Sequence, residues 1–277
     1  MSQSKKILIT GVTGLVGYAA YTHLAAQPER YEVYGLDRQR AMSARTPGAW
    51  RNEIPDERFH LCNLTDFDGI RAAVAGMDVV VHLAADPKGD GWESLRDNNL
   101  IGAYHIFETC AEAGVQRIVA ASSITVSQGH RAMEPYKAMA ERRHVNIPAA
   151  IQPVTVDIPA TPRGLYAATK VWAESLGQVY AHQHNLSCIL LRIGQVDRDW
   201  PRPPRGSDVF VSQRDVVGLI EACINADESV RFDIFYALSN NDMRWADMEH
   251  ARQVVGFVPQ DRAEDGFDYD AALTGGP

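Results

Sequence analysis

Short, continuous apolar runs alternate with amphipathic segments along most of the chain. The runs have the length of buried β-strands, and the segments between them repeat their apolar residues with the period of a helix. We predict strands at residues 7–9, 33–36, 78–82, 117–121 and 187–193, and helices at residues 18–26, 66–74, 92–113 and 166–182. Right-handed crossovers place helices on both faces of a sheet built from such strands. The predicted fold class is therefore α/β, a doubly wound parallel sheet.

A glycine-rich turn joins the first predicted strand to the first helix. Gly11 permits the tight turn, Gly14 allows a phosphate to approach closely, and Gly17 allows the helix to pack on the strand. Backbone amides and the positive end of the helix then point toward a pyrophosphate. A glycine triplet alone is also compatible with an ordinary strand-to-helix turn. The whole turn reads Thr10-Gly11-Val12-Thr13-Gly14-Leu15-Val16-Gly17.

An aspartate at the end of the second predicted strand completes this motif. Asp37 stands 20 residues after Gly17. A carboxylate at that place binds ribose hydroxyls and repels a 2′-phosphate, so the motif favours NAD over NADP. The neighbouring Arg38 leaves NADP open, because its guanidinium would accept a phosphate if the aspartate turned away.

A tyrosine and a lysine, Tyr166 and Lys170, lie four residues apart at the start of a predicted helix and so share one face. A phenol with a pKa of roughly 10 is a poor base at neutral pH, but a neighbouring ammonium and a cationic nicotinamide both stabilise its phenolate. Tyr166 could then accept a hydroxyl proton while a hydride leaves the substrate, and Lys170 could hold the nicotinamide ribose.

A serine pair, Ser122 and Ser123, follows the predicted strand at residues 117–121. The hydroxyl of Ser123 could donate to the substrate oxygen and stabilise its alkoxide character. Singly, a serine pair is an ordinary helix cap or turn, and a Tyr and Lys four apart are common on amphipathic helices. Together they predict a catalytic site of Ser123, Tyr166 and Lys170.

With these motifs the chain resembles the extended short-chain dehydrogenases, the group that includes NAD-dependent epimerases and dehydratases. The resemblance covers nearly the whole chain. It rests on residues 10–17, Asp37, Asn63-Leu64, His82-Leu83-Ala84-Ala85, Asn98-Asn99, Ser122-Ser123, Tyr166 with Lys170, and Leu191-Arg192-Ile193-Gly194.

This resemblance implies which residues hold the cofactor. Asn63 would lie near the adenine, residues 83–85 would line the cofactor after a strand, and Asn99 would support the active site from the long helix. The expected NAD-binding residues are Gly11, Thr13, Gly14, Leu15, Val16, Gly17, Asp37, Arg38, Asn63, Leu64, Leu83, Ala84, Ala85, Asn99, Tyr166, Lys170 and Ile193. In such families the helices around 92–113 and 166–184 commonly form a dimeric four-helix bundle, so a homodimer is implied.

Two stretches, residues 129–164 and 196–206, interrupt the alternation of strands and helices. Both follow predicted strands, where ligands of open α/β sheets bind. We predict an NAD-binding Rossmann domain over residues 1–195 with an insertion at about 129–164. Residues 196–277 are expected to form a small substrate-binding lobe interwoven with it.

Within the family, the chain is most similar in look to uronate dehydrogenases and related sugar dehydrogenases. The similarity lies in residues 192–194, 209–215 and 255–261. It implies that the substrate contacts Ser123, Ile124, Thr125, Gln195 and Arg205. Arginine suits a carboxylate or phosphate because its planar fork makes two hydrogen bonds.

Departures from those enzymes leave the substrate open. Uronate dehydrogenases carry Asn-His where this chain has Ile124-Thr125, and Pro87 replaces a serine. Arg205 could equally be a solvent-facing residue of a stiff, proline-rich loop.

Composition narrows the partners. A net charge of −8 gives no electrostatic indication of binding to nucleic acid or to an anionic membrane, because both need a clustered basic face. The residues before the glycine motif contain no apolar stretch long enough for a signal peptide or a membrane span, so a cytoplasmic protein is expected. The four cysteines form no close pair, and no metal is expected.

Three functions fit the sequence. The first is an NAD-dependent oxidoreductase that removes a hydride from a sugar or sugar-acid-like alcohol. The second is a nucleotide-sugar epimerase or dehydratase that keeps its NAD tightly bound and returns the hydride to the same substrate. The third is a non-catalytic NAD-binding regulator, which the presence of Ser123, Tyr166 and Lys170 disfavours.

Overall fold

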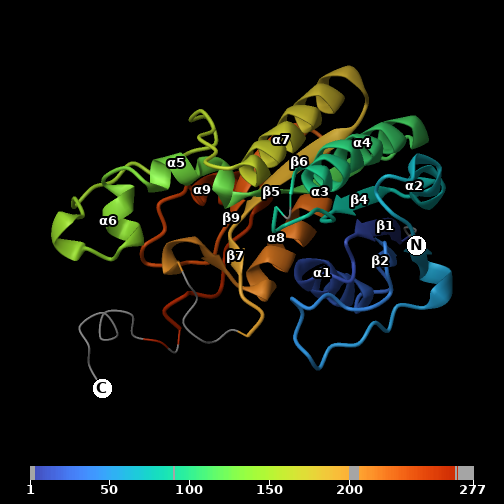
Figure 1. Cartoon of the computed structure of the whole chain (residues 1–277), viewed down its shortest axis with the longest axis horizontal. Helices are drawn as coiled ribbons and strands as arrows, with labels where there is room; N and C mark the ends of the chain where they lie inside the picture. The colour runs from blue at the N-terminus through green and yellow to red at the C-terminus, as the bar shows by residue number, and fades with distance from the viewer. Residues whose placement is uncertain (1–3, 90, 200–205, 266, 268–277) are drawn as a thin grey trace.

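The computed structural model describes residues 4–89, 91–199, 206–265 and 267. Its main sheet has seven strands, and this sheet runs through the centre of the molecule (Figure 1). All its neighbouring strands are parallel, in the order β3-β2-β1-β4-β5-β6-β9. This confirms the predicted doubly wound α/β fold. The strands are β1 (Lys5–Thr10), β2 (Tyr31–Asp37), β3 (Phe59–Leu61), β4 (Val79–His82), β5 (Arg117–Ser123), β6 (Ser187–Ile193) and β9 (Phe232–Ala237).

Helices cover both faces of the sheet. Those on one face are α2 (Phe67–Val74), α4 (Gly102–Ala113) and α7 (Leu165–Gln183), and those on the other are α1 (Leu15–Ala25) and α8 (Gln213–Ile224). The remaining elements are η1 (Asp56–Arg58), α3 (Trp92–Ser94), η2 (Leu95–Ile101), η3 (Ile124–Ser127), α5 (Gln128–Arg131), α6 (Tyr136–Ala140), η4 (His144–Asn146), β7 (Gln195–Val196), η5 (Ser207–Val209), β8 (Phe210–Val211) and α9 (Glu249–Val255). No helix in this described part of the chain combines the length and apolar character needed to cross a membrane.

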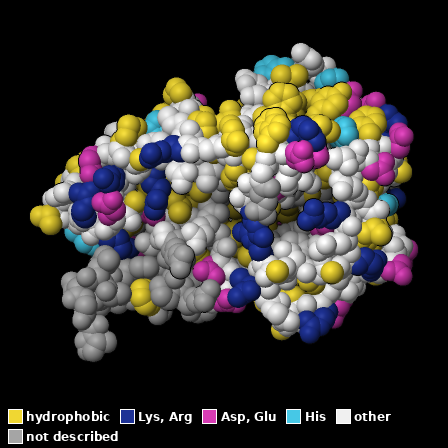
Figure 2. Space-filling model, viewed as in Figure 1, with side chains coloured by type: hydrophobic (Ala, Val, Ile, Leu, Met, Phe, Trp, Pro, Cys, Tyr) yellow, Lys and Arg dark blue, Asp and Glu magenta, His cyan; other side chains and the backbone are white. Residues whose placement is uncertain are grey.

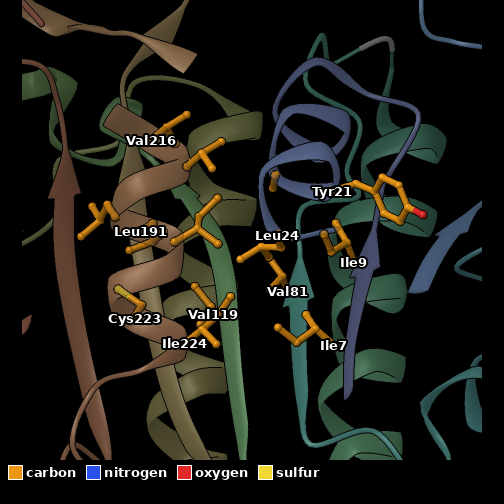
Figure 3. Packing of buried hydrophobic residues seen from close by; sticks show 14 of the residues in the cluster. Ile7, Ile9, Tyr21, Leu24, Val81, Val119, Leu191, Val216, Cys223 and Ile224 are labelled. Carbon is orange, nitrogen blue, oxygen red and sulfur yellow. The ribbon is translucent and has the colours of Figure 1, made fainter. Parts of the chain in front are cut away.

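The sheet separates two apolar cores. Ile7 and Ile9 of β1 point toward α1 and α8, where Leu24 and Ile224 pack against them (Figure 3). Leu8, between them in sequence, packs into the second core, under α2, α4 and α7. Because every central strand is buried on both faces, its sequence is continuously apolar rather than alternating.

The segment around the long predicted helix differs from the expectation in one respect. Residues 92–113 form α3, the π-helical η2 and then α4, instead of one regular α-helix. Gly102 begins α4 against the side chain of Leu64, which a Cβ at that position would approach to 2.7 Å. The π-helical residues include Asn99, which is buried and makes hydrogen bonds toward the candidate site described below.

The C-terminal segment completes the main sheet. Its strand β9 pairs with β6 from Cys188 with Phe232 to Ile193 with Ala237, and α8 packs beside α1. Neither β9 nor the short edge strand β3 was predicted, because each is brief and lies among polar or mixed residues. The interweaving of residues 196–277 with the rest of the chain is thus visible in the sheet itself.

The stretch 129–164 packs on the C-terminal segment. Val154 bridges to Ala246, and both belong to a third apolar cluster that includes the buried Trp245. Arg131 forms an ion pair with the fully buried Asp208. The stretch, with α5 and α6, extends to the left in Figure 1, away from α1 and α2.

Candidate active site

A cavity of about 580 Å³ lies beyond the carboxyl ends of the central strands. Figure 2 shows a hollow near the middle of one face with basic side chains at its border. Most of the residues predicted from sequence meet here. Of those residues, the cavity is lined by Gly11, Thr13, Gly14, Leu15, Val16, Gly17, Asp37, Arg38, Asn63, Leu64, Leu83, Ala84, Ala85, Ser123, Tyr166, Lys170, Ile193 and Gln195.

The glycine-rich turn forms one wall of this cavity. Gly11 has a positive φ of 70°, and a Cβ there would lie 2.8 Å from the backbone of Ala84. A Cβ on Gly17 would lie 2.1 Å from the carbonyl oxygen of Gly11, so helix and turn touch directly. A Cβ on Gly14 would meet only that same oxygen, at 3.1 Å. The surface above Gly14 is therefore open, as the close approach of a phosphate requires.

Two further features of this wall suit a dinucleotide. Gly14 is the N-cap of helix α1, no side chain caps the first amides of the helix, and its first turn has no acidic residue, so its positive end is available to an anion. Asp37 ends β2 at the cavity, and its carboxylate accepts hydrogen bonds from the backbone and hydroxyl of Thr13, at 3.0 and 2.8 Å, and from the amide of Arg38 at 2.8 Å. The residues present therefore fit the pyrophosphate and a ribose of NAD.

Lys170 lies on the opposite wall, on the first turns of α7. It is 6% exposed, and its Nζ donates a hydrogen bond of 2.8 Å to the carbonyl oxygen of Ala121 in β5. Burial lowers the pKa of Lys170 to about 8. Its ammonium lies 5.8 Å from the ring centroid of Tyr166, one helical turn away.

Opposing effects act on the pKa of the Tyr166 phenol. Burial raises the pKa of its phenol, while a hydrogen bond with Ser123 and the positive charge of Arg45 oppose that rise. The hydroxyl of Ser123 also accepts hydrogen bonds from the backbone and the hydroxyl of Thr125, at 3.2 and 2.9 Å. The site thus contains a phenol, a serine hydroxyl and an ammonium in one cavity, which is the set that proton transfer from an alcohol needs.

A buried ion pair lies directly behind these groups. Arg192 of β6 makes two hydrogen bonds to the carboxylate of Glu174, at 2.9 and 3.0 Å, and Glu174 lies one turn after Lys170 on α7. Ser122, the neighbour of Ser123, donates to the same carboxylate at 2.6 Å. These contacts join β5, β6 and α7 where the candidate catalytic side chains begin.

Three residues that were expected to contact NAD or the substrate, namely Asn99, Ile124 and Thr125, do not line the cavity. Asn99 is buried, donates to the backbone of Asp86 and to the hydroxyl of Thr169, each at 3.1 Å, and accepts from the Asp86 amide at 2.7 Å. Ile124 packs into the third apolar cluster, and Thr125 faces Ser123. Arg205 lies outside the described residues.

The structure also brings in residues that sequence reasoning missed. Gln39, Ser43, Ala44 and Arg45 come from the loop after β2, and Lys88 comes from the loop after β4. No periodic pattern or motif marks these loops, although a position directly after a parallel strand is itself a signal. The stretch 129–164 contributes no residue to the lining. Among the described residues, no three His, Cys, Asp or Glu side chains gather as a metal site requires.

Comparison with known proteins identifies the family. The sequence model of the NAD-dependent epimerase/dehydratase family matches residues 7–196. The chain is 29% identical over 260 residues to the NAD-dependent glucose-6-phosphate dehydrogenase of Haloferax volcanii, covering 93% of this chain and 94% of that one. It is 30% identical over 261 residues to a uronate dehydrogenase of Agrobacterium fabrum, covering 94% and 86%.

A solved structure is similar over almost the same length. A mutant of the uronate dehydrogenase from Agrobacterium tumefaciens, complexed with NAD, superimposes with a TM-score of 0.74 at 28% identity, covering 98% of this chain and 89% of that one. The resemblance to extended short-chain dehydrogenases, and to uronate and other sugar dehydrogenases among them, is thereby confirmed. The chain belongs to the NAD-dependent epimerase/dehydratase family and is an NAD-dependent enzyme.

Proposed function

We propose that this enzyme oxidises a sugar or sugar-acid-like alcohol with NAD, and that Ser123, Tyr166 and Lys170 carry the reaction. The observation that supports this most strongly is that all three residues line one cavity together with the glycine-rich turn and Asp37. Relatives that match almost the whole chain are named as dehydrogenases of glucose 6-phosphate and of uronates, which favours net oxidation of a carbohydrate.

Each catalytic side chain has one task in this proposal. NAD, held by the glycine-rich turn and Asp37, would supply the acceptor for the hydride on the carbon that carries the substrate hydroxyl. Tyr166 accepts the proton of that hydroxyl, so that the alcohol becomes a carbonyl compound. Ser123 donates a hydrogen bond to the same oxygen as negative charge develops on it. Lys170, with a pKa of about 8, still carries its positive charge at pH 7 and favours the phenolate of Tyr166.

Substrate and cofactor take opposite parts of the cavity. The glycine turn, Asp37, Asn63 and the residues after β4 form the part that would hold NAD. We place the substrate beside Ser123 and Gln195, because Gln195 begins β7 directly after β6 and lines the same cavity.

A substrate panel tests this function. The purified enzyme is supplied with NAD and with aldoses, uronates and sugar phosphates, and the absorbance of reduced nicotinamide is followed. We expect NADH to accumulate with at least one of them. NAD that co-purifies and resists dialysis, together with substrate conversion but no net NADH, would instead establish the epimerase or dehydratase alternative.

We also propose a homodimer built on α4 and α7. In Figure 2, hydrophobic side chains gather over these two helices. Among the described residues, Ile101, Tyr104, Trp172 and Val179 are large apolar side chains at least 37% exposed on η2, α4 and α7. A contiguous exposed apolar patch marks an interaction surface, here proposed as the contact between two copies of the chain.

A further inference from the structure

Two arginines line the cavity, Arg38 and Arg45, and neither guanidinium has a partner among the described residues. Arg38 lies beside Asp37, at the wall assigned to the dinucleotide. Arg45 lines the same cavity as Ser123, Tyr166 and Lys170. Its backbone amide is bonded to the hydroxyl of Ser43 at 3.3 Å, but its guanidinium makes no hydrogen bond or ion pair with any residue that the structure describes. By contrast, the guanidinium groups of Arg40 and Arg51 both donate hydrogen bonds to backbone carbonyl oxygens of the same loop.

The backbone that carries Arg45 is fixed to the glycine-rich turn. The amide of Ser43 donates to the carbonyl oxygen of Thr13 at 3.0 Å, and Thr46, which is buried, donates to Ser43 through both its amide and its hydroxyl. Arg45 lies inside this short turn, so its position relative to the dinucleotide wall is set by the fold.

The charge of Arg45 also acts on the candidate catalytic base. Its positive charge acts on the phenol of Tyr166, opposing the rise in pKa that burial causes. The guanidinium therefore lies within electrostatic reach of the reacting end of the cavity.

A second segment meets the turn from the other side of the cavity. Arg198, which follows β7, donates to the carbonyl oxygen of Ala44 at 3.4 Å. Gln195 and Val196, at the start of that segment, line the cavity with Arg45. The segment after β7 and the turn that carries Arg45 thus touch each other, and both contribute residues to the cavity.

We propose that Arg45 binds the anionic group, carboxylate or phosphate, of the substrate and so determines specificity for acidic over neutral sugars. An unpaired guanidinium can bind either a carboxylate or a phosphate, because two of its N–H groups can donate parallel hydrogen bonds to two oxygens of the anion. This inference rests on the proposed function, because it assumes a carbohydrate beside Tyr166. The same chemistry could in principle serve the pyrophosphate of NAD, and the experiment separates the two sources.

The test measures binding rather than turnover. A hexuronate, a hexose 6-phosphate and the neutral hexose are titrated calorimetrically into the NAD complex of Tyr166→Phe, with and without Arg45→Gln. We expect Arg45→Gln to weaken the binding of an anionic sugar roughly 10- to 100-fold and to leave the neutral hexose unchanged. Arg45→Lys keeps the positive charge but cannot make the two parallel hydrogen bonds, so it should retain only part of the affinity for the anionic sugar.

Two controls make the outcome decisive. Arg51→Ala removes a positive charge from the same loop, outside the cavity lining, and should not change the ratio of affinities for anionic and neutral sugars. Titration of NAD into Arg45→Gln should give the affinity of the protein with Arg45 intact. A loss of NAD affinity with an unchanged sugar ratio would assign Arg45 to the cofactor and overturn the proposal, as would an equal loss for all three sugars.

Failure of this inference differs from failure of the proposed function. If the wild-type enzyme reduces NAD with a sugar and Arg45→Gln leaves the anion preference intact, only the role of Arg45 is refuted. If no alcohol yields NADH with the wild-type enzyme, the proposed oxidation itself fails, whatever the calorimetry shows.

Discussion

At the scale of single residues, burial governs the charge of Lys170. The folded chain lowers the pKa of this lysine from its ordinary 10.5 to about 8, because its ammonium is removed from water and compensated by one carbonyl oxygen. Between pH 8 and 10.5 the unfolded chain therefore binds a proton that the folded chain lacks. The free energy of unfolding should rise with pH across this window, and below about pH 8 the cost of burying the charge is present in full.

Substituting Lys170→Met tests this linkage. In urea unfolding without NAD, the difference in the free energy of unfolding, wild type minus variant, should rise between pH 8 and 10.5 by up to roughly 1.4 kcal/mol per pH unit. Comparing the two proteins removes the contribution of the titrating groups that do not interact with Lys170. A difference that does not change with pH would show that Lys170 is not buried as a charged group.

Candidate site residues could be predicted from the sequence only where the intervals between them form a recognisable motif. The glycines, Asp37, Tyr166 and Lys170 were found because their intervals are set by one turn and one helix face. Arg45 was missed, because the loop after β2 has no periodicity that indicates which side chain turns inward. Ile124 and Thr125 were expected at the substrate by resemblance, but Ile124 is buried in an apolar cluster and neither residue lines the cavity.

At the scale of elements, the turn between β1 and α1 combines two different demands on glycine. Gly17 is needed for packing, since a Cβ there would overlap the carbonyl oxygen of Gly11. Gly14 lines the cavity, and we propose that its missing side chain lets the pyrophosphate of NAD approach the backbone.

Alanine substitutions separate these demands. Gly14→Ala should weaken NAD binding at least roughly tenfold while the melting temperature without ligand changes little, because only one contact, at 3.1 Å, is tightened. Gly17→Ala should lower both the NAD affinity and the stability, by several kcal/mol for a forced backbone shift. Calorimetric titration and thermal unfolding measure the two effects. Equal destabilisation by both substitutions would contradict the assignment.

The order of elements was predictable to a useful degree. Continuous apolar runs indicated β1, β2, β4, β5 and β6. A strand that is buried on both faces needs apolar residues at successive positions, so its sequence is recognisable. The break of the long helix at η2 could not be predicted, since the π-helical geometry depends on tertiary contacts of Asn99 and Gly102. The ion pair between Glu174 and Arg192 was likewise invisible, because its partners are 18 residues apart on different elements.

At the scale of the whole molecule, the apolar face of α4 and α7 predicts self-association. The mass in solution, measured by sedimentation equilibrium, should be twice 30.6 kDa. Tyr104→Glu combined with Val179→Glu should shift it toward the monomer, because both side chains are exposed on that face. Leu61→Glu is the matched control, since Leu61 is 67% exposed on the edge strand β3. A wild-type monomer would refute the dimer.

The division of the chain into parts could be predicted from the sequence only in outline. The stretch at 129–164 was recognised as an interruption, but its position could not be predicted, because its packing depends on Trp245 and Asp208 far along the chain. The predicted division at residue 195 remains a prediction, and β9 shows how closely the two parts share one sheet.

The central claim is that Tyr166 is the acid-base group for a hydride transfer beside bound NAD. Replacing it by phenylalanine and measuring both NADH formation and NAD affinity tests this most directly. We expect Tyr166→Phe to lower kcat by roughly 10²-fold or more while the Kd for NAD stays within about twofold of the wild-type value. Turnover close to that of the wild type, with NAD binding intact, would contradict the account.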